Sequence, residues 1–114
     1  MQAEIISIGD EILIGMTVDS NAAWMGRELT NLGIEVYQMI SITDNREHIL
    51  KVVDESINRS DLVLVTGGLG PTNDDITKET LSDYFNTRLV EDKNILGDIE
   101  RFIKNRGLEM NENN

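Results

Sequence analysis

Hydrophobic and polar positions along the chain follow two periods, one typical of strands and one typical of helices. Apolar runs rich in β-branched residues occur at 3–8, 34–42 and 62–65, and they predict three buried strands. Between these runs, apolar residues recur every three or four positions, which predicts helices over about 20–32 and between 44 and 60. The predicted order is therefore strand, helix, strand, helix, strand.

Capping residues mark where the first two helices are expected to begin and end. Ser20 is expected to cap the first helix, and Gly33 is expected to end it. Thr43 or Asp44 is expected to cap the second. The residues expected on the buried faces are Ala22, Met25, Leu29 and Leu32 in the first helix and Ile49, Val52, Val53 and Ile57 in the second.

Two more helices are predicted after the third strand. One covers 76–85 and the other covers 94–106, with Gly107 as its end. The segment 88–92 between them suits either a short edge strand or a plain connection, and the pattern does not decide. The residues expected to face inward are Leu81, Tyr84 and Phe85 in the first of these helices and Ile95, Leu96, Ile99, Phe102 and Ile103 in the second.

Strands that alternate with helices predict an α/β fold. Parallel strands joined by crossover helices give three α/β/α layers with a mostly parallel sheet, and ligands of such folds bind beyond the carboxyl ends of the strands. With 114 residues the chain can bury one modest core, so a single domain over 1–114 is expected.

The segment 66–77 joins a buried strand directly to a glycine-rich loop. It reads Thr-Gly-Gly-Leu-Gly-Pro-Thr-Asn-Asp-Asp-Ile-Thr. Glycine lets backbone N–H groups approach a phosphate closely, and the neighbouring carboxylates and hydroxyls suit a hard metal ion. The alternative is a tight turn in which Thr72, Asp75 or Thr77 caps the following helix. The spacing matches neither a P-loop nor the dinucleotide fingerprint.

Charge and composition narrow the classes of partner. The formal net charge is −11, which disfavours nucleic acid and anionic membrane surfaces as partners. Cysteine is absent, so disulfides and thiolate metal sites are excluded. No run approaches the roughly 20 apolar residues that span a bilayer. A cytoplasmic protein that binds a small molecule is expected.

Several motifs together resemble one known family. The glycine loop has the order Gly-Gly-x-Gly-Pro-Thr-x-Asp-Asp-x-Thr, and it is preceded by Gly-Asp-Glu-Ile-Leu at 9–13, Asp-Ser-Asn at 19–21 and Ile-Thr-Asp-Asn at 42–45. This combination resembles the molybdopterin-binding fold shared by MoaB, MogA and gephyrin. Within that superfamily it is most similar to the N-terminal domain of the competence/damage-inducible CinA family, across nearly the whole chain.

The resemblance implies a function and its alternative. It implies metal-dependent hydrolysis of the ADP-ribose pyrophosphate bond, with a divalent cation as cofactor. The alternative is a module that binds molybdopterin or another phosphate ligand without catalysis. The family domain is longer, so the chain is expected to be incomplete at its C-terminus and to self-associate into a homo-oligomer. Nothing in it corresponds to the deamidase domain of CinA proteins.

The resemblance also implies roles for individual residues at the expected carboxyl edge. Asp75 and Asp44 align with the carboxylates that the family uses in chemistry, while either one could also cap a helix. Contacts to the ligand or its phosphate are expected from Gly67, Gly68, Gly70, Thr72, Thr77 and Asn21, where the alternative for Asn21 is an ordinary early helix residue. From their positions, metal ligation is expected from Asp10, Glu11 and Asp74, and the alternative for Asp10 is closure of the turn after Gly9.

Overall fold

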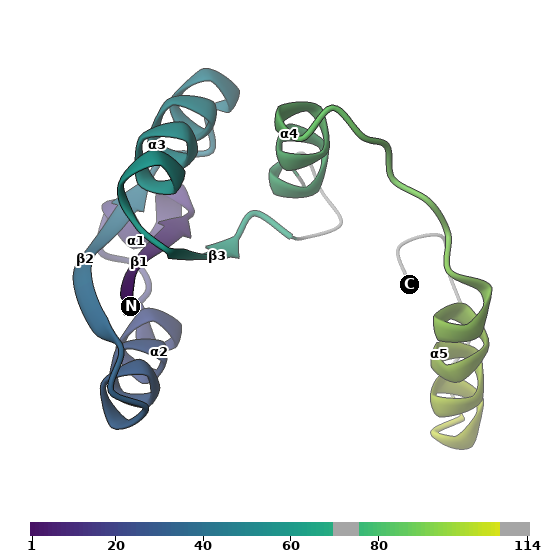
Figure 1. Ribbon diagram of the computed structural model, residues 1–114. Helices are drawn as coiled ribbons and strands as arrows, with labels where there is room; N and C mark the ends of the chain where they lie inside the picture. Colours follow the sequence, from purple (N-terminus) through teal and green to yellow (C-terminus); the bar gives the residue numbers. More distant parts are fainter. Residues whose placement is uncertain (70–75, 108–114) are drawn as a thin grey trace.

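The computed structural model describes residues 1–69 and 76–107, and it contains a three-stranded parallel sheet (Figure 1). The strands are β1 (Gln2–Ile8), β2 (Glu35–Ile42) and β3 (Leu62–Gly67). Their order is β2-β1-β3, with both pairings parallel. All three predicted strands are confirmed. Because all three strands are parallel, the loops that leave them emerge at the same edge of the sheet.

Helices cover both faces of this sheet. The helix α2 (Ser20–Asn31) packs on one face and α3 (Arg46–Arg59) on the other, while α4 (Thr77–Tyr84) packs beside α3 (Figure 1). A short helix, α1 (Asp10–Leu13), follows β1 directly and was not predicted as an element. The three-layer α/β fold class is confirmed.

Two apolar clusters join the layers. The side chains of β1 alternate between them, as the period of a strand requires. The cluster under α3 consists of Ile6, Ile8, Ile42, Ile49, Val52 and Val53, and the cluster under α2 consists of Ala3, Ile5, Ala22 and Leu29. The predicted burial of α2 and α3 is therefore largely correct.

Two predicted caps are wrong by one or two residues. Asp19, not Ser20, caps α2, because its carboxylate accepts the Ala22 N–H at 3.1 Å. Asn45 caps α3 by accepting the His48 N–H at 3.0 Å. A cap must directly precede the first helical turn, and the sequence offers two competent residue types in a row at both places. Asp44 therefore does not cap α3.

In α2, α3 and α4, three residues predicted to be buried are exposed instead. Leu32 is 74% exposed and Phe85 is 60% exposed, because each follows the last turn of its helix, beyond the region that packs on the sheet. Ile57 lies at 36% exposure, and its neighbour Ser56 is fully buried in its place. Ser56 is buried in place of Ile57 because its hydroxyl donates a hydrogen bond to the buried Glu4 carboxylate.

Glu4 lies in the middle of the predicted apolar strand, yet its carboxylate is fully buried in β1. Arg59 donates to both of its oxygens, at 2.7 and 3.2 Å, and Gln38 donates at 2.7 Å. Ser60 completes the set. Burial alone would raise the pKa of Glu4, but the hydrogen bonds from Arg59, Ser60 and Gln38 outweigh it and lower that pKa. This network fixes α3 against the sheet, near the amino ends of the strands.

The last helix, α5 (Lys93–Asn105), lies apart from the sheet in Figure 1. Its N-terminus is capped by Asp92, and the segment 88–92 forms neither helix nor strand. Of its predicted inner face, Ile103 is buried, whereas Ile95 and Phe102 are each 57% exposed. None of the helices in the described ranges is both long and apolar enough to cross a membrane.

Candidate functional site at the carboxyl edge of the sheet

The loops after β1 and β2 meet through a hydrogen-bonded contact. The Asp10 carboxylate accepts the Thr43 hydroxyl at 2.6 Å and the Asp44 N–H at 3.4 Å. In addition, the Gly9 N–H donates to the Ile42 carbonyl at 3.0 Å. Asp10 and Asp44, which are 34 residues apart in sequence, are thereby brought to the same edge of the sheet.

The glycine turn after β3 lies at the same edge. Gly67 pairs with Ile8, the last residue of β1, and it has a φ of +91°. Gly68 follows with a φ of +62°. Only glycine readily adopts positive φ angles at two consecutive positions, and glycine places no side chain between the backbone and a ligand. The loops that follow all three strands are thus close neighbours.

Thr77 closes the glycine turn from the helix side. Its hydroxyl donates to the Gly67 carbonyl at 2.8 Å, and its N–H donates to the Gly68 carbonyl at 3.3 Å. The residue is only 3% exposed. The side chain of Thr77 therefore holds the start of α4 against the end of β3, and its contact with a phosphate stays a prediction.

A pocket of about 160 Å³ lies beside this turn. It contains two of the predicted residues, Glu11 and Asn21, and it is bordered by Gly67. Thr17 is brought to it because the N–H groups of Met16 and Thr17 both donate to the Glu11 carbonyl, so the chain turns back on α1. The lining residues are Ile8, Glu11, Ile12, Thr17, Val18, Asp19, Ser20, Asn21, Thr66 and Gly67.

Asp10 and Glu11, predicted to share a metal ion, turn to opposite sides. Asp10 bonds to the loop after β2, whereas Glu11 lines the pocket at the end of β3. Within 1–69 and 76–107, no group of three or more Asp, Glu, His or Cys side chains could hold a metal ion. The residues that the structure describes therefore do not by themselves form a metal site, and the third predicted ligand, Asp74, lies outside them.

Four predicted site residues lie outside the described residues altogether: Gly70, Thr72, Asp74 and Asp75. Their roles stay predictions. Conversely, the structure draws attention to Asp19, Ser20 and Thr66, which the sequence did not single out as site residues. The position of Thr66 could have been predicted from the sequence, because it is the last residue with a side chain before the glycine turn and therefore lies at the edge of the sheet.

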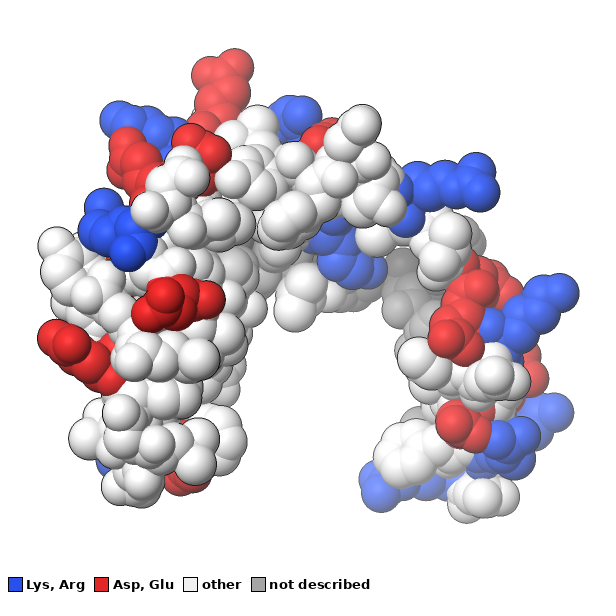
Figure 2. Space-filling model, in the orientation of Figure 1, with Lys and Arg blue, Asp and Glu red and all other residues white. Residues whose placement is uncertain are grey.

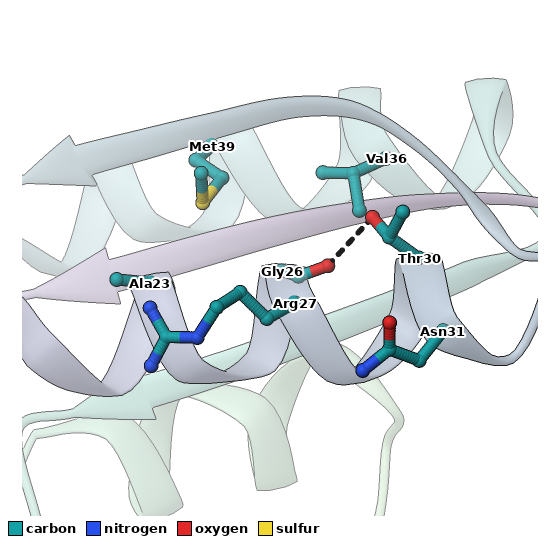
Figure 3. Close-up of a pocket in the computed structure, with 7 residues that line it drawn as sticks. All are labelled: Ala23, Gly26, Arg27, Thr30, Asn31, Val36 and Met39. Atoms are coloured by element: carbon teal, nitrogen blue, oxygen red, sulfur yellow. Dashed lines mark hydrogen bonds between the residues drawn. The ribbon is translucent and has the colours of Figure 1, made fainter.

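A larger pocket lies elsewhere among the described residues, between α2 and the strand β2 (Figure 3). It measures about 480 Å³, and no carboxylate lines it. Figure 3 shows Met39 facing the helix across from Gly26, while the Thr30 hydroxyl is turned inward to the Gly26 carbonyl, a hydrogen bond of 2.8 Å. Arg27 and Asn31 are at its rim. This groove is an apolar surface without a group suited to catalysis, so the carboxyl edge is the better candidate site.

Comparisons with known proteins support the same fold. Residues 4–111 match the family described as "Probable molybdopterin binding domain". A relative from Clostridioides difficile, named "Putative competence-damage inducible protein", is 49% identical over 114 residues. The match covers the whole of this chain but only 27% of that relative's length.

Two solved structures extend the comparison. The CinA protein of unknown function from Thermoplasma acidophilum matches 98% of this chain and 65% of its own, with a TM-score of 0.81 and 34% identity. The tungsten cofactor synthesizing protein MoaB from Pyrococcus furiosus matches 72% of this chain and 51% of its own, with a TM-score of 0.65 and 28% identity.

Proposed function

This chain belongs to the molybdopterin binding domain family, and we propose that its carboxyl edge binds a nucleotide and hydrolyses the ADP-ribose pyrophosphate bond. The observation that carries the proposal is the convergence at this edge of the Gly67-Gly68 turn with Asp10 and Asp44. Ligands of parallel α/β sheets bind at this edge, and glycine backbone can approach a phosphate closely. Carboxylates near a phosphate suit the positioning of an attacking water.

The proposed reaction assigns a simple task to the aspartates. A water oxygen forms a bond to one phosphorus, and the bond from that phosphorus to the bridging oxygen breaks. The bridging oxygen leaves with the other phosphate, so AMP and ribose 5-phosphate are the products. Asp44 is half-buried in the loop after β2, and we assign its carboxylate the task of orienting the water and taking its proton.

The charge of the pyrophosphate needs compensation at this edge. Asp10, Glu11, Asp19 and Asp44 are all acidic, and in the view of Figure 2 acidic side chains are spread over the surface rather than gathered in one patch. A divalent cation supplied with the nucleotide would offset that repulsion. The described residues do not form a metal site by themselves. The dependence of hydrolysis on a divalent cation is therefore measured directly.

A second candidate function is the binding of a pterin phosphate without hydrolysis. The MoaB neighbour from Pyrococcus furiosus, described as a tungsten cofactor synthesizing protein, favours this alternative. The pocket argues against it, since about 160 Å³ is room for roughly five waters, and no aromatic side chain among the described residues lines it to stack on a fused ring. Nucleotide hydrolysis is therefore the stronger proposal.

The decisive experiment measures the release of AMP from ADP-ribose by chromatography, with added Mg²⁺ and again with a chelator. Asp44→Asn should lower the rate by roughly 10²- to 10⁴-fold, the range for loss of an acid/base group. Asp98→Asn is the matched control, because Asp98 is on α5 and pairs with Arg101 there. Absence of AMP release by the unaltered chain would contradict hydrolysis, and binding of a pterin phosphate in a parallel titration would then support the alternative.

A further inference from the structure

The pocket beside the glycine turn has a chemical character of its own. Among the described residues, its polar lining consists of two carboxylates, three hydroxyls and one amide, without Lys, Arg or His. We propose that this pocket takes the vicinal hydroxyls of a ribose, and that the phosphates of the nucleotide stay outside it. This inference rests on the proposed function and assigns one part of the substrate to one part of the site.

The Glu11 carboxylate lies close to Gly9, the residue that precedes α1. A Cβ on Gly9 would lie 2.5 Å from Glu11 Oε1 and 2.8 Å from its Oε2, so the carboxylate lies directly over the bare Cα of Gly9. The φ of Gly9, 163°, is an extended conformation that any residue adopts. The absence of a side chain there is thus explained by the position of Glu11 and not by the backbone.

Asp19 and the hydroxyls complete a surface that accepts hydrogen bonds. One Asp19 oxygen caps α2 through the Ala22 N–H, and this fixes the carboxylate at the pocket. Thr66 lines the pocket from β3, where it pairs in register with Ser7. The Ser7 hydroxyl is 1% exposed and has no hydrogen-bond partner among the described residues, so this part of the sheet surface is polar beneath the pocket as well.

This lining selects among the parts of ADP-ribose. Two carboxylates without a basic neighbour repel a phosphate, whereas sugar hydroxyls donate to carboxylates, as in other nucleotide sites where an acidic residue binds the ribose. The volume of about 160 Å³ holds roughly five waters, which is the scale of one sugar ring and not of a whole nucleotide. The phosphates would then lie toward the bordering Gly67-Gly68 turn.

The test compares ligands with and without the hydroxyls by calorimetry on the full chain. The probes are AMP, AMP lacking the 2′-hydroxyl, ribose 5-phosphate and 2-deoxyribose 5-phosphate. Loss of one hydroxyl that bonds a carboxylate should weaken binding by roughly 10- to 100-fold. The AMP pair reports on the adenosine ribose and the ribose 5-phosphate pair on the terminal ribose, so the pair that shows the effect identifies which sugar occupies the pocket.

Three variants locate the effect at this pocket. Glu11→Gln, Thr66→Val and Gly9→Ala should each weaken binding of the hydroxylated ligand and shrink the difference between the paired ligands. Gly9→Ala keeps the Glu11 side chain but displaces its flexible carboxylate. Gly97→Ala in α5 is its control, since its nearest neighbour is an Arg101 nitrogen at 3.6 Å. Circular dichroism confirms that each variant is folded.

The outcomes separate this inference from the function itself. Equal binding of both members of each pair overturns the ribose assignment, even when ADP-ribose is hydrolysed. Binding of Mg²⁺ alone that is lost in Glu11→Gln makes the pocket a cation site and also overturns it. Hydroxyl-dependent binding of ribose 5-phosphate without ADP-ribose hydrolysis supports the pocket assignment and contradicts the hydrolase proposal. No binding of any probe overturns the assignment.

Discussion

Gly67 faces Ile8 so closely across the β1–β3 pairing that a Cβ on Gly67 would lie 2.0 Å from the Ile8 carbonyl oxygen. Such a distance is far below contact between a carbon and an oxygen, and the atom that would be struck belongs to the backbone of the central strand. The φ of Gly67, +91°, is also unfavourable for any other residue. Glycine is therefore required at the exact point where β3 becomes the glycine loop.

The first prediction follows from that contact. Gly67→Ala should destabilise the fold by about 3–5 kcal/mol, because it combines overpacking with an unfavourable φ. Gly33→Ala is the control, since Gly33 has a φ of +78° but would meet no atom within 4 Å. It should cost about 1–2 kcal/mol. Urea denaturation measures both, and equal losses would mean that the contact with Ile8 relaxes freely.

The second prediction concerns the buried carboxylate of Glu4. Glu4→Gln should lower the free energy of unfolding at neutral pH by about 3 kcal/mol, the low end for breaking a buried ion pair, because the Arg59 side chain keeps 38% exposure and can turn to water. Asp98→Asn breaks an exposed pair on α5 and should cost at most about 1 kcal/mol. Similar losses for both would show that the Glu4 network contributes no more than a surface pair.

The third prediction is the pH dependence of the same group. The pKa of Glu4 is lowered in the folded chain, so its stabilising contribution is fully present above the ordinary value of 4.5. It is lost as the pH falls through the lower folded pKa, because the unfolded chain takes up the proton first. Acid denaturation of Glu4→Gln should therefore show a shallower loss of stability below pH 4.5 than the unaltered chain. Parallel curves would contradict this.

The fourth prediction addresses Asp75, whose role is inferred from the family resemblance. Asp75→Asn should preserve the fold and nucleotide affinity and should lower ADP-ribose hydrolysis by roughly 10²- to 10⁴-fold. Asparagine caps helices about as well as aspartate, so the substitution separates chemistry from capping. Steady-state kinetics together with thermal unfolding measure the two effects. Unchanged turnover would remove Asp75 from the catalytic residues, and loss of folding would assign it to the structure.

The fifth prediction is self-association through α5. Its exposed Ile95 and Phe102 form an uncovered apolar face. The same helix carries the basic residues Lys93, Arg101 and Lys104, whereas the whole chain has a net charge of −11. These basic groups favour contact with the acidic surface of a second copy of the chain. Light scattering at roughly tens of micromolar should give a mass above that of the monomer, because unpartnered apolar surface promotes association. Phe102→Glu should reduce that mass, and Leu89→Glu is the control outside the helix.

The fold could be predicted from the sequence because its signals are local. Apolar runs of the right length specify β1, β2 and β3. The three- and four-residue spacings within Ala22, Met25 and Leu29 and within Ile49, Val52 and Val53 specify which helix faces are buried. The position of the glycine loop at the end of a strand could also be predicted, because the glycines directly follow an apolar run. The family followed from the spacing of short motifs, which is also a property of the sequence alone.

The tertiary structure alone decided how individual side chains are used, since each such choice depends on a neighbour that is distant in sequence. Glu4 is buried because Arg59, 55 residues away, donates two hydrogen bonds to it. Asp10 and Glu11 are adjacent in sequence, yet one bonds to the end of β2 and the other lines a pocket at the end of β3. A pattern of residue types carries no information about these partners, because the parallel pairing of β1 with two other strands is what brings them together.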